Sequence, residues 1–282
     1  MSTNRTTSRP SDVFIEEDEV TRNKRGIPWI RLEQALHTEG CPLCHLVMTE
    51  ARKHLTSILH EYVLDVSVRK KLHASFGFCN DHAWLAREVE SELHSDGQHL
   101  GTLHESIIQM ETEALRKAYA MGRDEGAKRR ALKKVGLHPI VRRVIEAITP
   151  GSECFLCRSS RATGRFYASQ CILMCCDNDF RTLFESKTLL LCRRHFKTVL
   201  LEAHELNAVD YFVSQQIAKV ERLSAQITLF LERHAVERRH EPRGTEWHSW
   251  LSALEHCSCK NGVDRVCEPG VLYSPIKKGT NR

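Results

Sequence analysis

Long apolar runs are absent from this chain of 282 residues. No stretch of about 18 consecutive apolar residues occurs, which is the length that a helix needs to cross a bilayer, so we expect no membrane association. Residues 1–10 are polar and contain no apolar leader core, which argues against a secretory signal. We therefore expect a cytoplasmic protein.

The motifs of common enzyme classes are missing as well. The chain has no Gly-rich phosphate loop, no Gly-x-Ser-x-Gly turn and no His-Glu-x2-His pair. Alternation of apolar and polar residues is nearly absent, so strands are not expected. A hydrophobic content of 41% and a charged content of 27% are ordinary for a folded domain and exclude wholesale disorder. The sequence favours an all-α fold without a recognisable catalytic site.

Cysteine, by contrast, is plentiful, with twelve residues. In a reducing compartment so many thiols are better explained by metal binding than by disulfides. One spacing, Cys-x2-Cys followed after a long gap by Cys-x2-His, occurs twice with the same gap. A single offset, called here the repeat offset, separates the two copies at all four positions of the motif. It relates Cys41 to Cys154, Cys44 to Cys157, Cys79 to Cys192 and His82 to His195.

Three thiolates and one imidazole form a common structural zinc set that leaves no position for water. We expect two zinc ions per chain, one in each repeat, bound by Cys41, Cys44, Cys79 and His82 and by Cys154, Cys157, Cys192 and His195.

Other chemistries for the Cys-x2-Cys pairs are less well supported. Cys41 to His45 also spells the attachment signal of a c-type haem, but Arg158 stands where the second copy would need histidine. A redox dithiol would need a βαβ context, which is missing. An iron–sulfur cluster commonly has other cysteine spacings. Structural zinc therefore remains the metal that we expect both sets of residues to bind.

The duplication extends beyond the metal ligands. Two apolar stripes have helical steps of three and four, one at Leu100, Leu103, Ile107, Met110, Ala114 and Ala118, the other at Val213, Ile217, Val220, Leu223, Ile227 and Leu231. All their positions except Leu103 and Ile217 superpose at the repeat offset. We predict two copies of a four-helix unit, in which zinc joins the first and third helices. The first helices are expected at about 43–64 and 155–176, and the second at about 66–75 and 178–187.

This organisation predicts six segments. They are a disordered tail over 1–27, the first zinc-binding unit over 28–121, a basic linker over 122–138, the second unit over 139–238, a C-terminal capping helix over 239–262 and a loose tail over 263–282.

Six cysteines lie outside the repeated sets. Cys171 and Cys175 are expected to be small apolar core residues on one helix face. A third metal site is conceivable at His256, Cys257, Cys259 and Cys267, but no repeat supports it, and incidental surface thiols at a helix end are favoured.

The net charge of +5 is mild and concentrated in residues 122–160. Clustered Lys and Arg attract phosphates, yet this stretch has no interleaved aromatic residues and contains Asp124, Glu125 and several glycines. We expect an interaction or scaffold module with a protein partner. A nucleic-acid-binding regulator that uses the basic linker and an enzyme with a cleft between the units are the alternatives. The sequence does not specify the oligomeric state.

Three segments resemble a known family. They are residues 41–44, the stretch Gly-Phe-Cys-x2-His-x-Trp over 77–84, and the Gly-Glu-Trp-containing segment 241–250. Together they resemble a prokaryotic family of uncharacterised proteins, catalogued as a domain of unknown function, and the likeness covers roughly residues 28–262. The second unit departs from its pattern at Phe155 and at residues 189–191. The resemblance implies twin Cys-x2-Cys … Cys-x2-His units and a Gly-Glu-Trp-rich C-terminal helix, and no known activity.

Overall fold

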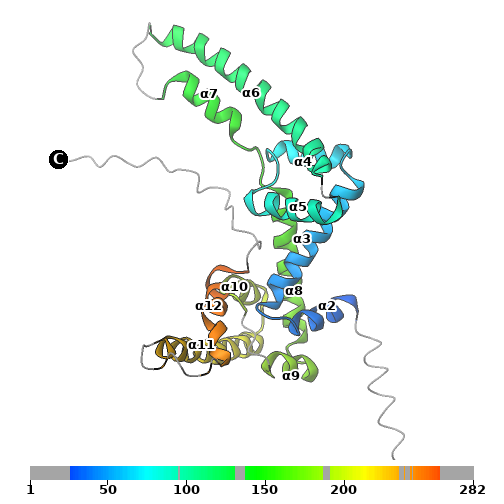
Figure 1. The fold of residues 1–282 in the computed structure, drawn as a ribbon, viewed down its shortest axis with the longest axis vertical. Coiled ribbons are helices and arrows are strands. Elements are labelled where there is room, and N and C mark those ends of the chain that lie inside the picture. The colour runs from blue at the N-terminus through cyan, green and yellow to red at the C-terminus, as the bar shows by residue number, and fades with distance from the viewer. Residues whose placement is uncertain are drawn as a thin grey trace, which may run out of the picture. The chain divides into compact units, whose positions relative to one another are not determined.

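The computed structural model describes residues 26–94, 96–130, 137–186, 191–234, 238, 242 and 244–260. Within these ranges every regular element is a helix, which confirms the all-α prediction (Figure 1). The α-helices are α2 (Ile27–Leu36), α3 (Pro42–Glu61), α4 (Val66–Ala74), α5 (Asn80–Leu93), α6 (Gln98–Arg130), α7 (Pro139–Ile148), α8 (Phe155–Met174), α9 (Asn178–Ser186), α10 (Arg193–Glu202), α11 (Leu206–Arg233) and α12 (Ser249–Ser258). A 3-10 helix, η2 (Thr245–His248), precedes α12.

The helices of the two halves correspond in order, and the first three pairs also correspond in length. Helices α3 and α8 have 20 residues each, and α4 and α9 have nine each, close to the predicted ranges. A pair that was not predicted, α2 and α7, adds a ten-residue helix before each Cys-x2-Cys segment. Both have a proline in the first helical turn, where the missing N–H of proline costs no hydrogen bond. The duplication remains an inference from these matched spacings.

The compact units of the structure are not the contiguous halves. One unit takes its described residues from 1–46 and 164–259, and the other from 47–163 and 260–282. The expected units, 28–121 and 139–238, differ from this division. Its boundaries fall inside α3 and inside α8, so each of these helices contributes residues to both units. The physical reason is the packing of each core, which combines segments from both halves of the sequence.

From here on, the first unit is the compact unit that contains α2 and α9, and the second unit is the other one. In the first unit, α2 packs against α9 and contributes to an aromatic core. The Trp29 ring lies 6.4 Å from that of Phe180, and Phe180 stacks on Phe184 at 5.5 Å. Phe212 of α11 meets Phe184 edge-on at 5.6 Å. All four side chains are buried.

Helix α8 and the residue that follows it add two cysteines to the core of this unit. Cys171 and Cys175 are both buried, which confirms their assignment as core residues. Burial also raises the pKa of both thiols, as expected for cysteines that act as small apolar side chains.

In the second unit, the core combines α3 to α6 with the start of α8. Its buried members include Leu55, Leu59, Leu72, Leu85, Val89, Leu103 and Ile107 together with Cys154, Leu156 and Cys157. The Phe155 ring lies 6.0 Å from that of Phe78, which precedes Cys79. The second Cys-x2-Cys segment is thereby buried among helices of the first half.

The predicted linker over 122–138 is partly helical. Helix α6 continues to Arg130, and residues 131–136 lie outside the described residues. Helix α7 packs along the end of α6, as Figure 1 shows. A Cβ built on Gly122 would lie 2.5 Å from the Cα of Ile140, so the absence of a side chain lets the two backbones approach. Residues 122–130 of this segment thus belong to a helix that packs on α7 within the second unit.

The predicted C-terminal helix appears as η2 followed by α12, which packs against α10 and α11. Residues 1–25 of the predicted tail over 1–27, and the whole predicted tail over 263–282, lie outside the described residues.

Candidate metal centres

The eight predicted ligands gather into two groups. Cluster A consists of Cys41, Cys44, Cys192 and His195, and cluster B consists of Cys79, His82, Cys154 and Cys157. In each group the donor atoms all lie within 4.8 Å of one another, so that each group could hold a metal ion. Seven of the eight residues are buried, and Cys79 is partly buried.

The predicted grouping within each repeat was wrong. Each cluster combines the Cys-x2-Cys pair of one half with the Cys-x2-His pair of the other. The repeat offset relates cluster A to cluster B, because Cys41 corresponds to Cys154 and Cys79 to Cys192. The sequence spacing could not distinguish the two groupings, since both satisfy the same repeat. The choice depends on which first helix packs against which third helix.

Each ligand pair occupies the start of a helix. Cys41 and Cys154 immediately precede α3 and α8, and Cys79 and Cys192 are the N-cap residues of α5 and α10. The second ligand of each pair follows at the third position after the first, in the first turn and on the same side. Unpaired backbone N–H groups give a helix N-terminus a partial positive charge, which stabilises thiolates. In α10 the backbone N–H of His195 donates to Cys192 Sγ at 3.5 Å.

A tight turn delivers Cys79 to cluster B. After α4, Phe76 and Gly77 adopt positive φ values of 52° and 97°. The Gly77 N–H donates to the Leu72 carbonyl at 2.8 Å and so closes the end of α4. The glycine of the Gly-Phe-Cys segment, which carries the family resemblance, therefore has a structural reason, because a left-handed φ favours glycine. The corresponding residues before Leu191 lie outside the described residues.

The donor atoms are close in both clusters. In cluster A, His195 Nδ1 lies 3.2 Å from Cys44 Sγ, 3.3 Å from Cys192 Sγ and 3.5 Å from Cys41 Sγ. Cys44 Sγ and Cys192 Sγ are 3.6 Å apart. The Nδ1 atom of the histidine therefore faces all three sulfurs.

Cluster B has the same arrangement. His82 Nδ1 lies 3.2 Å from Cys79 Sγ, 3.5 Å from Cys157 Sγ and 3.9 Å from Cys154 Sγ. Cys79 and Cys157 bring their sulfurs within 3.5 Å.

A serine hydroxyl distinguishes cluster B from cluster A. The Nε2 atom of His82 lies 3.4 Å from the Ser160 hydroxyl, which orients the ring behind the donor atoms. Val47 stands at the position that corresponds to Ser160, so this contact has no counterpart at cluster A.

The electrostatics of the clusters favour charge on the histidines and on some of the thiols, whereas hydrogen bonds with Cys192 and Cys259 raise the pKa of Cys44. Burial opposes ionisation of Cys41, but hydrogen bonds with Cys192, Cys44 and His195 outweigh it and hold its pKa well below the ordinary value. Hydrogen bonds with Cys157 and Cys79 likewise lower the pKa of Cys154. Burial lowers and the neighbouring thiols raise the pKa of both His82 and His195, with a net rise to about 10. A metal ion would take the place of the shared protons, because ligation requires thiolate and neutral imidazole.

Sequence reasoning missed a fourth sulfur beside the three of cluster A. Cys259, directly after α12, has its Sγ 3.4 Å from that of Cys192. A hydrogen bond with Cys259 is the largest influence that lowers the pKa of Cys192 to about 6. No repeat marked Cys259, because it lies beyond the second repeat.

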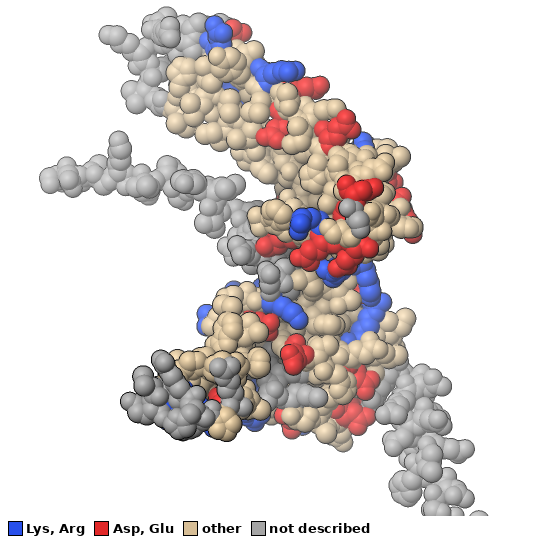
Figure 2. All heavy atoms as spheres, in the orientation of Figure 1, with Lys and Arg blue, Asp and Glu red and all other residues tan. Residues whose placement is uncertain are grey.

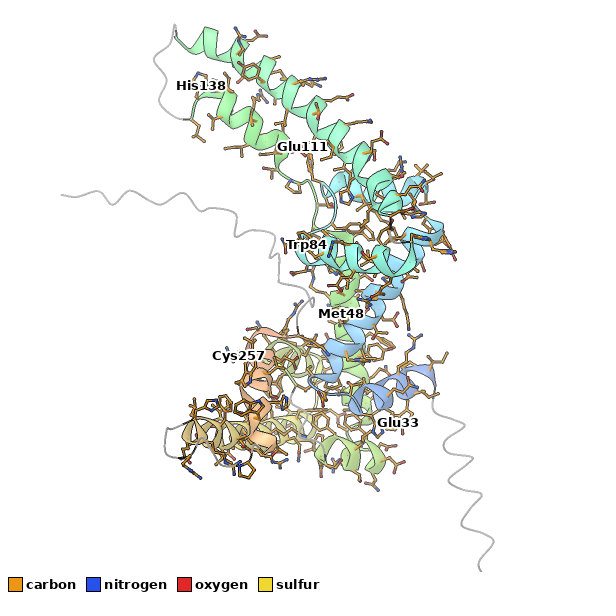
Figure 3. The ribbon with its side chains drawn as sticks, in the orientation of Figure 1. Glu33, Met48, Trp84, Glu111, His138 and Cys257 are labelled. Carbon is orange, nitrogen blue, oxygen red and sulfur yellow. The ribbon has the colours of Figure 1, made fainter. Side chains whose placement is uncertain are left out.

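The other C-terminal cysteines differ from Cys259. Cys257 is exposed, as Figure 3 illustrates, and receives a contact from Arg193 at 3.6 Å. The surface interpretation therefore holds for Cys257 and not for Cys259, whereas Cys267 lies outside the described residues.

The Gly-Glu-Trp segment fastens the C-terminal helices to the end of α11. Glu246 is buried, accepts a hydrogen bond from the Gly244 N–H at 2.9 Å and pairs with Arg233 at 2.5 Å. The Trp247 ring stacks on His234 at 5.0 Å and meets Phe230 at 5.5 Å. A Cβ at residue 244 would clash with the Glu246 carboxylate, which explains the glycine. This motif is structural, and it positions α12 and hence Cys259.

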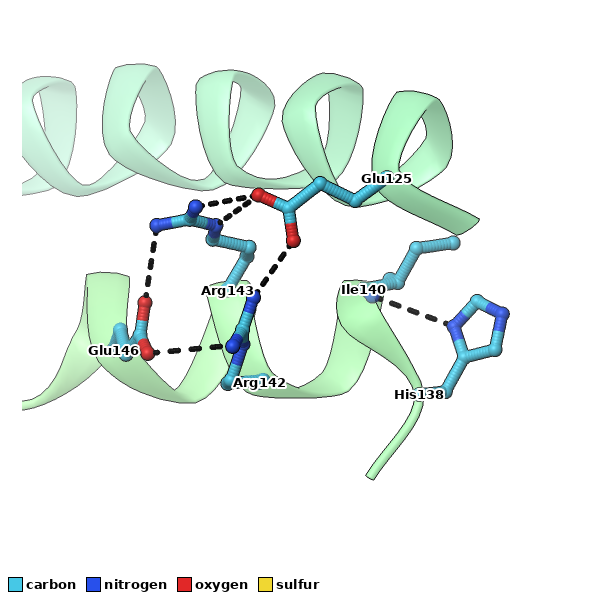
Figure 4. A network of polar contacts seen from close by, with 6 residues as sticks. All are labelled: Glu125, His138, Ile140, Arg142, Arg143 and Glu146. Carbon is cyan, nitrogen blue, oxygen red and sulfur yellow. Dashed lines mark hydrogen bonds and ion pairs between the residues drawn. The ribbon is translucent and has the colours of Figure 1, made fainter. Parts of the chain in front are cut away.

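Several residues of the basic stretch are engaged in ion pairs. Glu125 of α6 accepts from Arg142 at 2.7 Å and from Arg143 at 2.5 Å, and Glu146 lies 3.4 Å from Arg143 (Figure 4). Hydrogen bonding to Arg143 is the largest influence that lowers the pKa of the Glu125 carboxyl. Arg158 lies 3.6 Å from Glu153. These contacts reduce the positive charge that the stretch presents to phosphates.

Comparison with known proteins gives one family match. Residues 24–258 match the model of a family of unknown function, DUF6062. No curated protein and no solved structure matches. Among the described residues, none of the helices combines the length and the apolar character that crossing a membrane requires.

Proposed function

The chain belongs to this family of unknown function, and we propose that it is a zinc-stabilised interaction protein that binds a protein partner through α7. The proposal has two parts, the identity of the metal and the surface that the partner covers. Cytoplasmic location is included in it, because a reducing compartment keeps thiols available as ligands.

Zinc is supported by the donor set and by the spacing of the donors. Tetrahedral zinc, with bonds of about 2.3 Å to sulfur and about 2.0 Å to nitrogen, places two sulfurs about 3.8 Å apart and a sulfur and a nitrogen about 3.6 Å apart. The sulfur pairs at 3.5 and 3.6 Å and the sulfur–nitrogen pairs at 3.2 to 3.9 Å lie close to these values. With four protein donors, each ion would cross-link two helix starts that are far apart in sequence and would contribute directly to folding.

The observation that carries the partner proposal is the apolar outer face of α7. Val141, Ile145 and Ile148 of α7 follow one another at helical steps of four and three, and Leu137 lies just before the helix. Each of the four side chains is between 43% and 64% exposed. Tan side chains cover much of this side of the α6–α7 hairpin in Figure 2. Exposure of a stripe of aliphatic side chains to water is unfavourable, and a partner helix or groove would bury it.

The alternatives receive less support. The ion pairs of Glu125 and Glu153 engage Arg142, Arg143 and Arg158, so a nucleic acid would have to compete with carboxylates for them. An enzyme with a cleft between the units stays a prediction.

A photo-crosslinking amino acid at Ile148, in the full-length protein in cells, tests the partner proposal. We expect one discrete crosslinked species that contains this chain and a protein partner, and we expect Ile145→Asp to reduce its yield at least tenfold. Mass spectrometry identifies the partner, including a second copy of the chain. The matched control places the crosslinker at Leu173, an exposed leucine on α8.

Equal crosslinking from Ile148 and Leu173, or a yield that Ile145→Asp leaves unchanged, would contradict a partner on α7. A crosslinked species that nuclease treatment removes would instead support the nucleic-acid alternative. Because Ile145 is half-exposed and belongs to neither cluster, zinc content should stay unchanged in the variant, and elemental analysis verifies that it is folded.

A further inference from the structure

A second type of donor cluster lies at the turn between α5 and α6. Glu90, near the end of α5, Asp96 in the turn, and His99, in the first turn of α6, bring one donor atom each within 4.8 Å of the others. All three belong to the second compact unit, whose α5 and α6 are labelled in Figure 1. No thiol takes part, so the chemistry differs from that of clusters A and B.

The Glu90 carboxylate is only partly satisfied. The residue is 2% exposed. Its Oε1 accepts a hydrogen bond from the His99 backbone N–H at 3.1 Å and lies 3.4 Å from His99 Nδ1. Its buried Oε2 has no hydrogen-bond partner among the described residues. Capping of α6 accounts for Oε1 and leaves Oε2 unexplained, and a buried carboxylate oxygen without a partner is costly.

Two histidines at this turn show the same deficit. The His94 and His99 rings lie 4.1 Å apart, and His60 stacks on His94 at 6.1 Å. His94 Nε2 and His99 Nδ1 are buried and lack hydrogen-bond partners within the part of the chain that the structure describes. Nitrogen lone pairs beside a buried carboxylate form a favourable environment for a divalent cation, which can bind several of these donors at once.

The polar character of this turn is specific to the first half. The repeat offset places Ala203 opposite Glu90 and Phe212 opposite His99, and both replacements are apolar. Phe212 is buried in the aromatic core of the first unit. A position that the fold fills with a core phenylalanine in one half thus has a histidine beside a buried glutamate in the other. The fold alone does not require these donors.

We propose that Glu90, Asp96 and His99 bind a divalent transition-metal ion, with His94 next to it. Two carboxylates and an imidazole suit ions such as Zn²⁺, Co²⁺ or Mn²⁺. Asp96 is exposed, so the ion would be reached from solvent, and three protein ligands leave coordination positions for water or an exogenous ligand. This site would exchange its metal readily, whereas the four-donor clusters A and B would retain theirs.

Co²⁺ binding to the full-length protein, with clusters A and B first loaded with zinc, tests the proposal. Calorimetry should show one Co²⁺ bound per chain, with weak visible absorption from nitrogen and oxygen ligands. Glu90→Gln keeps a hydrogen-bond acceptor for the α6 cap and should raise the Kd at least tenfold. Asp96→Asn keeps an acceptor for the Gln98 N–H, which donates to Asp96 Oδ1 at 3.0 Å, and should also raise it.

The matched control is Glu88→Gln, on the same helix and exposed, which should leave the Kd unchanged. Absence of Co²⁺ binding beyond the zinc content would overturn the proposal, as would a Kd that neither Glu90→Gln nor Asp96→Asn alters. An intense near-ultraviolet band from sulfur-to-cobalt charge transfer would place the ion in a cysteine cluster and would overturn it as well. None of these outcomes depends on a protein partner at α7.

Discussion

His82 and His195 hold equivalent places in clusters B and A, yet their surroundings differ. Ser160 contacts the outer nitrogen of His82, and the residue that corresponds to it is Val47. Cluster A has Cys259 beside Cys192 instead. All eight residues of the two clusters were singled out from sequence because they follow a repeat. The residues that distinguish the clusters follow no repeat and became evident only from contacts.

Lys219 of α11 is a buried lysine that the sequence pattern did not single out. It is 4% exposed, and its Nζ donates to the Phe184 carbonyl at 2.6 Å, near the end of α9. Burial, assisted by repulsion from Arg222, lowers its pKa to about 8. The neutral amine can still donate this hydrogen bond. Because burial penalises only the charged form, the folded state favours loss of the proton.

This pKa predicts the pH dependence of stability. Between pH 8 and about 10.4, the ordinary lysine value, the unfolded chain binds more protons at this side chain than the folded chain, so the contribution of Lys219 to stability rises with pH. We compare the unfolding free energies of the wild type and Lys219→Met. The value for the wild type minus that for the variant should be about 1–3 kcal/mol larger at pH 10 than at pH 7.5. Urea unfolding of both zinc-loaded proteins measures this difference. Lys197→Met, at an exposed position, is the matched control, and a difference independent of pH would contradict the prediction.

At the scale of elements, the boundaries of α6 were the least predictable from sequence. Glycines and basic residues from residue 122 onward indicated a linker, yet α6 continues to Arg130. Contacts with α7 explain the continuation, because Glu125 binds Arg142 and Arg143 and Gly122 allows close packing. Tertiary contacts thus stabilise a helix that local propensity disfavours.

Gly122→Ala should destabilise the hairpin, although alanine is a better helix former than glycine. Its Cβ would meet the α7 backbone at 2.5 Å from the Ile140 Cα, and separation of the helices should cost about 1–3 kcal/mol. Hydrogen exchange of α7 amides and thermal unfolding measure this effect.

Gly101, also in α6, provides the matched control. No atom lies within 4 Å of a Cβ built there, so Gly101→Ala should stabilise the protein by up to about 1 kcal/mol. Opposite signs for the two variants are expected. Stabilisation by Gly122→Ala would show that α6 and α7 do not pack as closely as described.

At the scale of the whole molecule, each metal cluster takes its ligands from both halves of the chain. Cluster A joins residues more than 140 positions apart, and cluster B joins residues more than 70 apart. Closing such long loops lowers the entropy of the chain, and the bound ions would offset this cost. The two halves should therefore depend on each other for metal binding.

Paired substitutions distinguish this grouping from one within each repeat. Cys79→Ser with Cys154→Ser removes two ligands of cluster B and should leave about one zinc per chain after dialysis against a chelator. Cys41→Ser with Cys79→Ser removes one ligand from each cluster and should leave almost none. Elemental analysis measures both, and the reverse result would indicate that each repeat binds its own ion.

A single variant gives the same information if the double variants fold poorly. In Cys79→Ser, alkylation should reach Cys154 and Cys157 while Cys41 and Cys44 stay protected, which peptide mass spectrometry detects. Protection of Cys154 together with modification of Cys41 would contradict the grouping described here.

The all-α class, the helix ranges around the cysteines and histidines, and the choice of all eight residues of clusters A and B followed from local information. Helical periodicity and the short Cys-x2-Cys and Cys-x2-His spacings are properties of neighbouring residues. The partition into clusters A and B, the place of Cys259 and the donors around Glu90 depend on which distant segments pack together. A repeated sequence leaves that choice open, because both copies offer the same surfaces to each other. Side-chain packing within each unit, such as Trp29 against Phe180, resolves the ambiguity.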